Sequence, residues 1–512
     1  MIYFKPGILL SSVIALLFIS CSSHHISTVD AGDEIISVGN LKANLEFLSD
    51  DLLEGREATT RGEKLAGLFI SSELKKYGVS PYLNDYYQRF NLFAASSDRS
   101  SMVEVNSLQD KNIFRMNKDF YIIRSSENTD TVAAVFAGFG ITAEEFGYDD
   151  YAGIDVKDKI IIILPGEPYS RDKNFFDGEE ETTYSSFFSK IRRASAKGVK
   201  GIILLDTDTA GVNWNNWSDF VTKPALSLHP VKDKPSMTIL HFNYNASSLL
   251  MKGSEKNLEE LVNMDLNEQK ITVFEMSGKV NLSIKKISEN KESFNIIGII
   301  PGNDPNLKNE FVAIGAHFDH LGIKGNEVFN GADDDGSGVV AVLEVANAFM
   351  KTKANKRSIL VVFHAAEEKG LYGSEYLTGN LDIMDKIVAQ INIDMIGRES
   401  IDTLYSVGSD KINPLLKDIV EEANNESSGF IFNYKFDEPD DPEKIYFRSD
   451  HYNYAKNGIP VVFFYDNMKV DYHKTTDDVD KINFEKIKKT SELIYLTALK
   501  ISNNSINLRT NK

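Results

Sequence analysis

The chain has 512 residues, of which 42% are hydrophobic and 26% are charged, an ordinary globular composition that argues against overall disorder. Its 56 Lys and Arg residues are outnumbered by 75 Asp and Glu residues, so the formal net charge is −19. Nucleic-acid binding needs clustered positive charge, and we therefore expect no nucleic acid among the partners of this protein.

The first 20 residues predict an export signal. Lys5 supplies a positive end, and residues 8–19 form an apolar stretch that is too short to cross a bilayer. Cys21, the only cysteine of the chain, comes directly after this signal. A single cysteine excludes an internal disulfide and a cysteine-based zinc site.

The segment Phe18-Ile19-Ser20-Cys21 resembles a bacterial lipobox, although that pattern prefers Leu where Phe18 stands. An ordinary cleaved signal with an incidental cysteine is the alternative. We expect Cys21 to be lipidated and to anchor the protein to a membrane of the bacterial cell envelope. Ser22 favours the outer membrane, by analogy with known sorting signals, and leaves the periplasmic or surface face open.

Residues 36–78 predict helices. Leu41, Leu45 and Leu48 lie on one face, and apolar residues recur at the same spacing as far as Gly78, which is typical of a helix C-cap. The pattern of apolar and polar residues then changes between about residues 110 and 285. Short strand-like runs occur there, with one helix among them and many Asn, Asp and Gly residues between them. The runs are 132–136, 159–164 and 201–205, and the helix is 187–196. This stretch predicts a β-rich inserted module.

From residue 290 onward, continuous apolar strands alternate with helices. The expected strands are 296–300, 312–315, 359–363, 388–393 and 461–464, and the expected helices include 339–350 and 484–501. This alternation predicts an α/β domain with a mixed, largely parallel sheet covered by helices on both faces. The active site of such a sheet forms beyond the carboxyl ends of its strands.

Imidazole and carboxylate side chains follow several of these strand ends. The segments are His317-Phe318-Asp319-His320, Asp333-Asp334-Asp335, Glu367-Glu368, Asp394 and Tyr472-His473. These are ligands that zinc accepts, and two divalent ions would relieve the repulsion among so many carboxylates. Each motif alone has an ordinary alternative, such as a solvated acidic loop. Their joint occurrence after successive strands favours one metal centre.

Residues 295–473 resemble metallopeptidase family 28, the co-catalytic di-zinc aminopeptidases. The resemblance rests on His317-Phe318-Asp319, Asp334-Asp335-Gly336-Ser337-Gly338, Ala366-Glu367-Glu368, Asp394-Met395 and Tyr472-His473. Residues 45–78 are similar to the opening helices of that family. The inserted module resembles a protease-associated (PA) domain.

The resemblance implies two Zn²⁺ ions per chain. His317 and Asp394 would bind one ion, Glu368 and His473 would bind the other, and Asp334 would bridge both. Glu367 would be the general base that takes a proton from a metal-bound water.

Supporting roles are implied as well. Asp319 would orient His317 without binding the metal, and Asp335 would likewise lie behind the ligands. The peptide bond between Asp334 and Asp335 is expected to be cis. Tyr472 would stabilise the oxyanion, or would be a packed aromatic residue beside a ligand. His320, His364 and His451 are expected to be structural or to lie behind the ligands.

The expected fold is similar to that of zinc aminopeptidases and of the phosphorylase/hydrolase-like group, with a β-rich inserted domain. The expected order is a lipoprotein signal peptide (1–20), a tether (21–34), the N-terminal part of the peptidase domain (35–110), the PA-like insert (111–285) and the main part of the peptidase domain (286–505).

We expect a zinc-dependent aminopeptidase that removes N-terminal residues from peptides through a metal-bound hydroxide. A carboxypeptidase or dipeptidase of the same fold is the alternative, in which an arginine such as Arg448 reads a substrate carboxylate. A glutaminyl-cyclase-like transferase is less favoured, because those relatives work with one zinc. A binding lipoprotein with an inactive peptidase domain is disfavoured, since every ligand position is filled.

Overall fold

The computed structural model describes residues 35–106, 111–168, 172–178, 180–212, 214–215, 224–230, 236–252, 254–262, 271–398, 400–466 and 469–509. The predicted signal peptide, Cys21 and the tether lie outside the described residues. Among the described residues, no helix is both long and apolar enough to cross a membrane.

The N-terminal segment forms two helices joined by a turn. Helix α1 (Val38–Leu48) begins at Ser37, whose hydroxyl accepts a hydrogen bond from the Asn40 N–H at 3.3 Å. Helix α2 (Arg61–Tyr77) ends at Gly78 in the left-handed conformation, as the sequence predicted. The connecting turn η1 (Asp51–Arg56) contains Gly55, where an added Cβ would lie 2.4 Å from a backbone oxygen. This close approach requires glycine and presses the turn against the main domain.

The main sheet has ten strands. Its order is β11 (Ala225–Ser227), β2 (Tyr87–Ser97), β14 (Lys286–Ile300), β18 (Ser358–His364), β15 (Phe311–His317), β19 (Ile387–Ile393), β22 (Val461–Tyr465), β20 (Thr403–Val407) and β21 (Ile431–Asn433), with β1 (Ser80–Pro81) beside β14. The four central strands β18, β15, β19 and β22 run parallel. Strands β11, β2 and β14 and the pair β22–β20 are antiparallel. The prediction of a mixed sheet is confirmed, with its parallel pairs concentrated in the centre.

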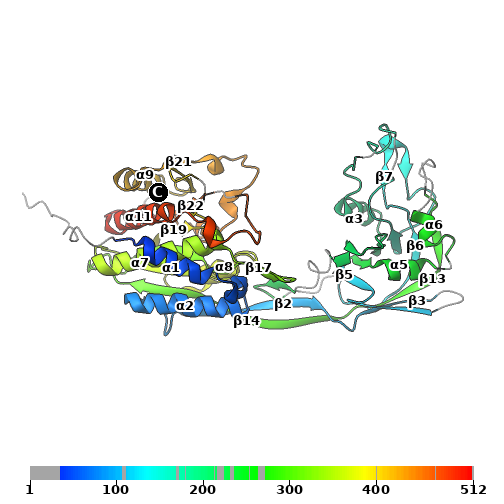
Figure 1. Cartoon of the computed structure of the whole chain (residues 1–512), viewed down its shortest axis with the longest axis horizontal. Helices are drawn as coiled ribbons and strands as arrows, with labels where there is room; N and C mark the ends of the chain where they lie inside the picture. The colour runs from blue at the N-terminus through cyan, green and yellow to red at the C-terminus, as the bar shows by residue number, and fades with distance from the viewer. Residues whose placement is uncertain are drawn as a thin grey trace, which may run out of the picture.

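Helices cover both faces of this sheet (Figure 1). One face packs against α1, α2, α7 (Gly338–Thr352), α9 (Leu415–Glu426) and α11 (Phe484–Asn503). The other face packs against α8 (Tyr372–Asn380) and α10 (His451–Lys456). The central strands are buried on both sides, which explains why they are apolar along their whole length.

The inserted module has a second sheet of eight strands. Its order is β4 (Lys111–Arg115), β3 (Met102–Asn106), β13 (Phe274–Ser283), β6 (Thr131–Phe136), β9 (Ile160–Ile163), β10 (Gly201–Leu204), β12 (Thr238–Phe242) and β5 (Phe120–Arg124). The module also contains α3 (Phe187–Ala196), α5 (Tyr244–Met251), α6 (Leu258–Val262) and the short pair β7 (Thr142–Ala143) and β8 (Tyr148–Asp149). The predicted helix 187–196 coincides with α3.

The module stands beside the main domain at the far end of the long strands β2 and β14 (Figure 1). Two details differ from the expected boundaries. Strand β3 belongs to the second sheet although it precedes residue 111, and β11 lies within 111–285 but pairs with β2 in the main sheet. The short pair β16 (Gly322–Lys324) and β17 (Glu327–Phe329) lies next to η1.

Candidate metal centre

The predicted site residues collect at the carboxyl ends of the central strands. His317 is the last residue of β15, Glu367 and Glu368 lie in the turn after β18, and Asp394 directly follows β19. Asp334 lies in the turn η3 (Ala332–Ser337), and His473 lies between β22 and α11. Parallel strands bring these segments to one edge of the sheet, although they are far apart in the sequence.

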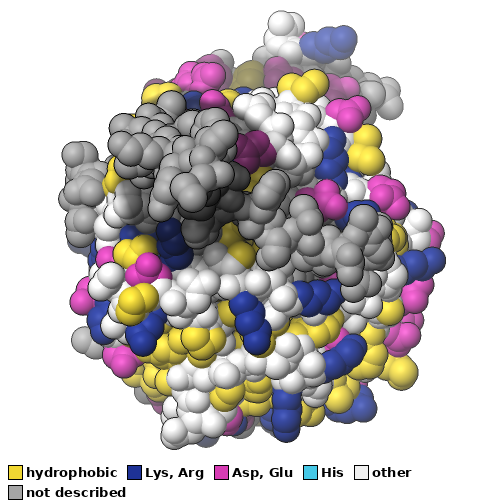
Figure 2. All heavy atoms as spheres, turned by 90° about the vertical axis from the view of Figure 1, so that its left-hand side faces the viewer, with side chains coloured by type: hydrophobic (Ala, Val, Ile, Leu, Met, Phe, Trp, Pro, Cys, Tyr) yellow, Lys and Arg dark blue, Asp and Glu magenta, His cyan; other side chains and the backbone are white. Residues whose placement is uncertain are grey.

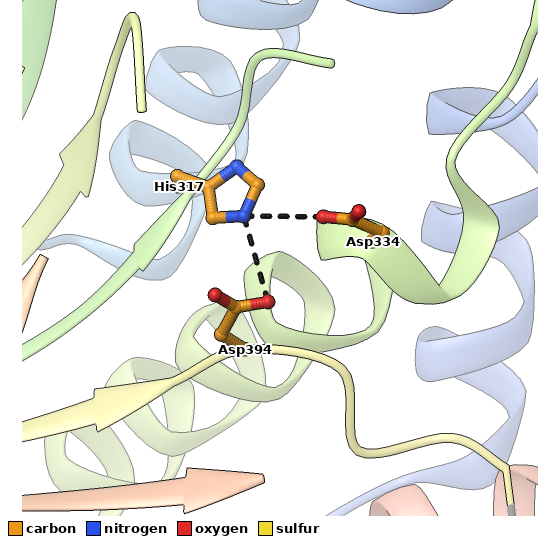
Figure 3. Close-up of side chains that lie close together, drawn as sticks. All are labelled: His317, Asp334 and Asp394. Carbon is orange, nitrogen blue, oxygen red and sulfur yellow. Dashed lines mark ion pairs between the residues drawn. The ribbon is translucent and has the colours of Figure 1, made fainter. Parts of the chain in front are cut away.

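His317, Asp334 and Asp394 form a first group of metal-ligand type (Figure 3). The Nε2 atom of His317 lies 3.3 Å from Oδ1 of Asp334 and 3.5 Å from Oδ1 of Asp394. All three side chains point toward the same space in Figure 3, and all three residues are buried.

A second group lies on the other side of Asp334. Its Oδ2 atom is 3.4 Å from Nε2 of His473, and the same nitrogen is 3.1 Å from Oε2 of Glu368. Asp334 therefore presents one oxygen to each group, which is the arrangement expected of a bridging carboxylate.

His320 adds an imidazole to the second group. Its Nδ1 atom lies 2.8 Å from Oε1 of Glu368 and 3.9 Å from Oδ2 of Asp334, and its side chain is fully buried. These three residues have ligand atoms close enough together to hold one ion. His320 was expected to be structural or to lie behind the ligands. Its place in the loop directly after β15, the strand that ends at His317, was the available signal for a direct role.

The residues present fit divalent metal ions. Ligands at 2.0–2.1 Å from a tetrahedral zinc are about 3.3 Å apart, and the nitrogen–oxygen separations around Asp334 are 3.3 and 3.4 Å. In addition, Oδ2 of Asp334, Oδ1 of Asp394 and Oε1 of Glu368 are buried and accept no hydrogen bond. Buried oxygens of this kind are costly unless a cation or a donor satisfies them.

The electrostatics of the two groups support the same interpretation. Burial by itself lowers the pKa of His317, but the surrounding carboxylates, Glu367 foremost, outweigh it and raise that pKa well above its usual value. Burial likewise lowers the pKa of His473, and Asp334 and Glu368 overcome this effect and raise it to about 9. In the absence of metal, protonated imidazoles therefore offset the carboxylate charge that divalent ions would otherwise neutralise.

Glu367 lies in the same pocket but belongs to neither group. Desolvation raises the pKa of its carboxyl group well above the usual value, with His317 opposing the shift and Glu368 adding to it. The backbone N–H of Glu367 donates to Oδ1 of Asp319 at 3.0 Å, which fixes the turn. A carboxyl group with a raised pKa beside two ligand groups is suited to accept and return a proton.

Asp319 orients His317, although through its backbone. The Nδ1 atom of His317 lies 3.1 Å from the backbone oxygen of Asp319 and 4.0 Å from its carboxylate. The carboxylate of Asp335 accepts hydrogen bonds from the N–H groups of His317, Gly338 and Met395 at 3.0–3.2 Å. It therefore ties together the segments that carry three of the predicted ligands. The peptide bond between Asp334 and Asp335 is cis.

Three further residues hold the ligands in place and were missed by sequence reasoning. Asp477 accepts hydrogen bonds from the backbone N–H of Asp334 at 3.1 Å and of its preceding residue. Ser449 donates to Oδ2 of Asp394 at 2.8 Å. Arg56 bonds the backbone of the loops around the site. Arg56 and Ser449 lie far along the sequence from the ligands that they support, and Asp477, although it follows His473 closely, belongs to no motif named above.

Tyr472 lines the pocket beside His473. Its ring stacks on the His473 imidazole with centroids 3.8 Å apart, and its hydroxyl accepts a hydrogen bond from Arg448 at 3.2 Å. Apolar side chains, among them Ile445 and Phe463, form another part of the lining. Both predicted roles of Tyr472 are compatible with this position, since it packs on a ligand and presents a hydroxyl to the pocket.

Comparison with known proteins finds a family whose model matches the part of the chain that carries this site. Residues 295–498 match the family model of Peptidase family M28. A protein of Aspergillus oryzae described as probable leucine aminopeptidase 2 is 29% identical over 198 residues, which is 36% of this chain and 36% of that protein. The chain thus spans about a third of the length of the curated relatives that it matches.

Two solved structures show the same fold over most of the chain. The aminopeptidase of Aneurinibacillus sp. strain AM-1 is 20% identical, with a TM-score of 0.53, and the match covers 93% of this chain and 97% of that one. A zinc aminopeptidase from Bacillus subtilis is 19% identical, with a TM-score of 0.51 and coverages of 93% and 98%. Residues 295–498, which match the model of Peptidase family M28, contain all the ligand candidates at the sheet edge.

Proposed function

We propose that the protein is a di-zinc exopeptidase that removes N-terminal residues from peptides. The observation that carries this proposal is the position of Asp334. Its two oxygens face separate ligand groups, and the carboxyl group of Glu367 lies in the same pocket outside both. A bridging carboxylate with a free carboxyl beside it is the arrangement that hydrolysis at a two-metal site requires.

His317, Asp334 and Asp394 would hold one zinc ion, and Asp334, Glu368 and His473 would hold the other, with His320 as an additional donor or as a support of Glu368. Bound zinc would supply a Lewis acid for the scissile carbonyl and make water a nucleophile near neutral pH. Glu367 would take the proton from the attacking water and transfer it to the leaving amine. Tyr472 would donate a hydrogen bond to the developing oxyanion.

The aminopeptidase assignment draws support from the fungal relatives named leucine aminopeptidase 2. The apolar wall of the pocket, with Ile445 and Phe463, suits the side chain of an apolar N-terminal residue. The carboxylates beside it suit a free amine.

One observation favours a second candidate, a carboxypeptidase or dipeptidase. Arg448 lines the same pocket, is exposed, and has the hydroxyl of Tyr472 as its hydrogen-bond partner rather than a carboxylate. A guanidinium in that position could bind the carboxylate of a substrate.

The test is hydrolysis of free-amine amino-acid nitroanilides alongside N-blocked peptides, by the chain from residue 22, with and without a chelator. We expect chelator-sensitive cleavage of the free-amine substrates alone. Cleavage of the blocked peptides alone would establish the second candidate. Absence of bound metal would favour a binding protein and overturn both.

Glu367→Gln tests the general base. We expect metal content to stay near two ions per chain and turnover to fall by about 10²–10⁴-fold, the usual contribution of a positioned acid or base. Glu327→Gln, an exposed position on β17, makes the same charge change away from the site and serves as the control. Full activity of the Glu367 variant would remove that residue from the mechanism.

We also propose that the mature protein is anchored to the bacterial cell envelope by lipid on Cys21, at the outer membrane. The support is sequence alone: the only cysteine follows a short apolar stretch. Mass spectrometry of the N-terminal peptide from membrane fractions should find an acylated Cys21. An unmodified Cys21, or a Cys21→Ser variant that stays in the membrane fraction like the parent chain, would contradict this anchor.

A further inference from the structure

The inserted module contains a cavity of about 500 Å³ beside α3, at a distance from the metal centre along the chain and in a different sheet. Its lining includes Lys190, Arg192 and Arg193 from α3. Thr142 and Thr183 also line the cavity. Three cations on one cavity are unexpected in a chain whose net charge is −19.

Lys190 is a buried residue in the wall of this cavity, and its side chain is held by hydrogen bonds. Its side chain is 2% exposed, and its ammonium group donates to the backbone oxygen of Leu164 at 3.1 Å and to that of Gly166. Within the described residues, no carboxylate is close enough to pair with it. An ammonium group has three N–H donors, so one remains for a ligand.

Arg192 and Arg193 are available for an anion. Both are exposed, and neither side chain forms a hydrogen bond or an ion pair within 4.0 Å of another described residue, although Arg193 lies near enough to Glu145 to lower the pKa of that carboxyl. The acidic residues near the cavity already accept hydrogen bonds. Asp150 accepts from the backbone N–H of Phe139 and from the hydroxyl of Tyr148 at 3.0 and 2.7 Å. 

Two more acidic groups are engaged in the same way. Glu145 accepts from the hydroxyl of Tyr184 at 2.6 Å, and Glu167 accepts from the backbone N–H of Thr182 at 2.6 Å. The local carboxylates are therefore held by neutral donors, while the arginine donors stay free. The side chains of Arg192 and Arg193 therefore keep hydrogen-bond donors that a carboxylate ligand can use.

The size and lining of the cavity favour a peptide over a bare anion. A volume of about 500 Å³ lies within the range of ligand pockets, about 300–1,000 Å³. Ile141 and Ala196 add apolar surface next to the cations. Helix α3 also lies on the side of the module that is nearer the main domain (Figure 1).

We propose that this cavity is a peptide-binding site, in which Arg192 and Arg193 bind a substrate carboxylate and Lys190 forms the buried wall. The choice of a peptide as the ligand rests on the proposed exopeptidase function. The site would hold the carboxylate-bearing part of a peptide away from the reacting end. It makes acidic peptides, or peptides with a free C-terminus, the preferred substrate class.

Burial lowers the pKa of Lys190 to about 7, while Asp150, Glu167 and Glu181 act to raise it. A bound carboxylate would favour the charged ammonium in the same way.

The test measures binding by fluorescence anisotropy with the zinc-loaded Glu367→Gln chain, so that the probe is not turned over. The probe is a peptide of six residues with a fluorophore on its N-terminus, made with either a C-terminal carboxylate or a C-terminal amide. We expect the carboxylate peptide to bind about tenfold more tightly, as for hydrogen bonds to a charged group. We expect Arg192→Gln/Arg193→Gln to remove this difference.

The matched control is Arg115→Gln/Lys118→Gln, which makes the same charge change on exposed residues at and after β4, the opposite edge of the module sheet. It should bind like the parent chain. Thermal melting and metal content of each variant confirm that it is folded.

Equal affinity for the acid and the amide, or an unchanged preference in Arg192→Gln/Arg193→Gln, would overturn the proposal. Displacement by inorganic phosphate with no peptide preference would also overturn it, in favour of a small-anion site. Because binding is measured without turnover, its failure is separate from a failure of the exopeptidase proposal, which would appear as missing chelator-sensitive hydrolysis.

Discussion

Arg56 shows how a single residue outside the family match can support the metal centre. Its guanidinium is 1% exposed and forms no ion pair among the described residues. It donates instead to four backbone oxygens, at distances of 2.6–2.9 Å, those of Leu48, Phe318, Asn330 and Gly331. Two of these lie in the segment leading to Asp334, and one follows His317. The planar, forked guanidinium thus joins the N-terminal turn to both ligand loops.

We predict that Arg56→Met weakens metal binding by at least about tenfold, because buried carbonyls lose charge-assisted donors and the loops lose their register. Competition with a chelator measures this effect without turnover. Arg56→Lys should restore part of the affinity, since it keeps the charge but lacks the fork. Arg61→Gln, on the exposed face of the same segment, is the control. Unchanged metal affinity of Arg56→Met would show that the contacts serve folding alone.

The shared position of Asp334 gives a prediction on stoichiometry. Asp394 faces one ligand group, whereas Asp334 faces both. Asp394→Ala should therefore retain close to one ion per chain after dialysis, and Asp334→Ala should retain close to none. Elemental analysis of folded variants measures the difference. Equal metal content in the two variants would contradict a bridging role.

A buried carboxyl group, that of Glu63, links helix α2 to the main sheet. Glu63 accepts a hydrogen bond from the backbone N–H of Thr59 at 2.8 Å and another from the hydroxyl of Ser293 on β14. Burial raises the pKa of Glu63 to about 8, against the effect of these donors. The folded protein therefore binds a proton here that the unfolded chain has already released near neutral pH.

This shift sets the pH dependence of stability. The folded pKa lies above the unfolded value of about 4.3, so the contribution is complete below that value and is lost as pH rises toward 8. The free energy of unfolding should fall with pH by up to about 1.4 kcal/mol per unit from this group. Glu63→Gln removes the ionisation, and its melting temperature should decline less between pH 5 and 8. A parallel decline in the parent and the variant would contradict the assignment.

The whole molecule is built as two sheets joined by a long antiparallel ribbon. Strands β2 and β14 pair continuously from Tyr87↔Ile296 to Ser97↔Lys286, and the module is inserted where this ribbon ends. Only β11 returns from the module region to the main sheet among the described strands. The ends of the ribbon are therefore neighbours, and a short turn can join them.

We predict that replacing residues 98–285 by Asn-Gly leaves a folded main domain. The two-residue turn suits an antiparallel pair that ends at Ser97 and Lys286. The shortened chain should melt cooperatively and bind metal, since every ligand lies outside the deleted segment. Loss of β11 should lower its melting temperature. It should also lose the preference for a peptide carboxylate.

Circular dichroism and elemental analysis check this prediction. A chain that neither folds nor binds metal would show that the two sheets form one cooperative unit.

The sequence by itself determined the regular elements and the ligand candidates. Helical spacing located α3 and α11 closely, and continuous apolar runs located the central strands, because these signals are local and repeat along one element. The ligand candidates were identified as the His, Asp and Glu residues that follow predicted strands. Parallel strands place their carboxyl ends at one edge, so the sequence was enough to bring His317 and Asp394 together.

Only the tertiary structure decided how the ligands are supported. Arg56 and Asp477 form hydrogen bonds with backbone groups near Asp334, and Asp319 orients His317 through its backbone oxygen. Backbone N–H and C=O groups are the same in almost every residue, so a sequence carries no sign of which side chain each of them will meet. The pairing of β11 with β2 was hidden for the same reason: strand partners are chosen by packing and register across the sheet, far from any local pattern.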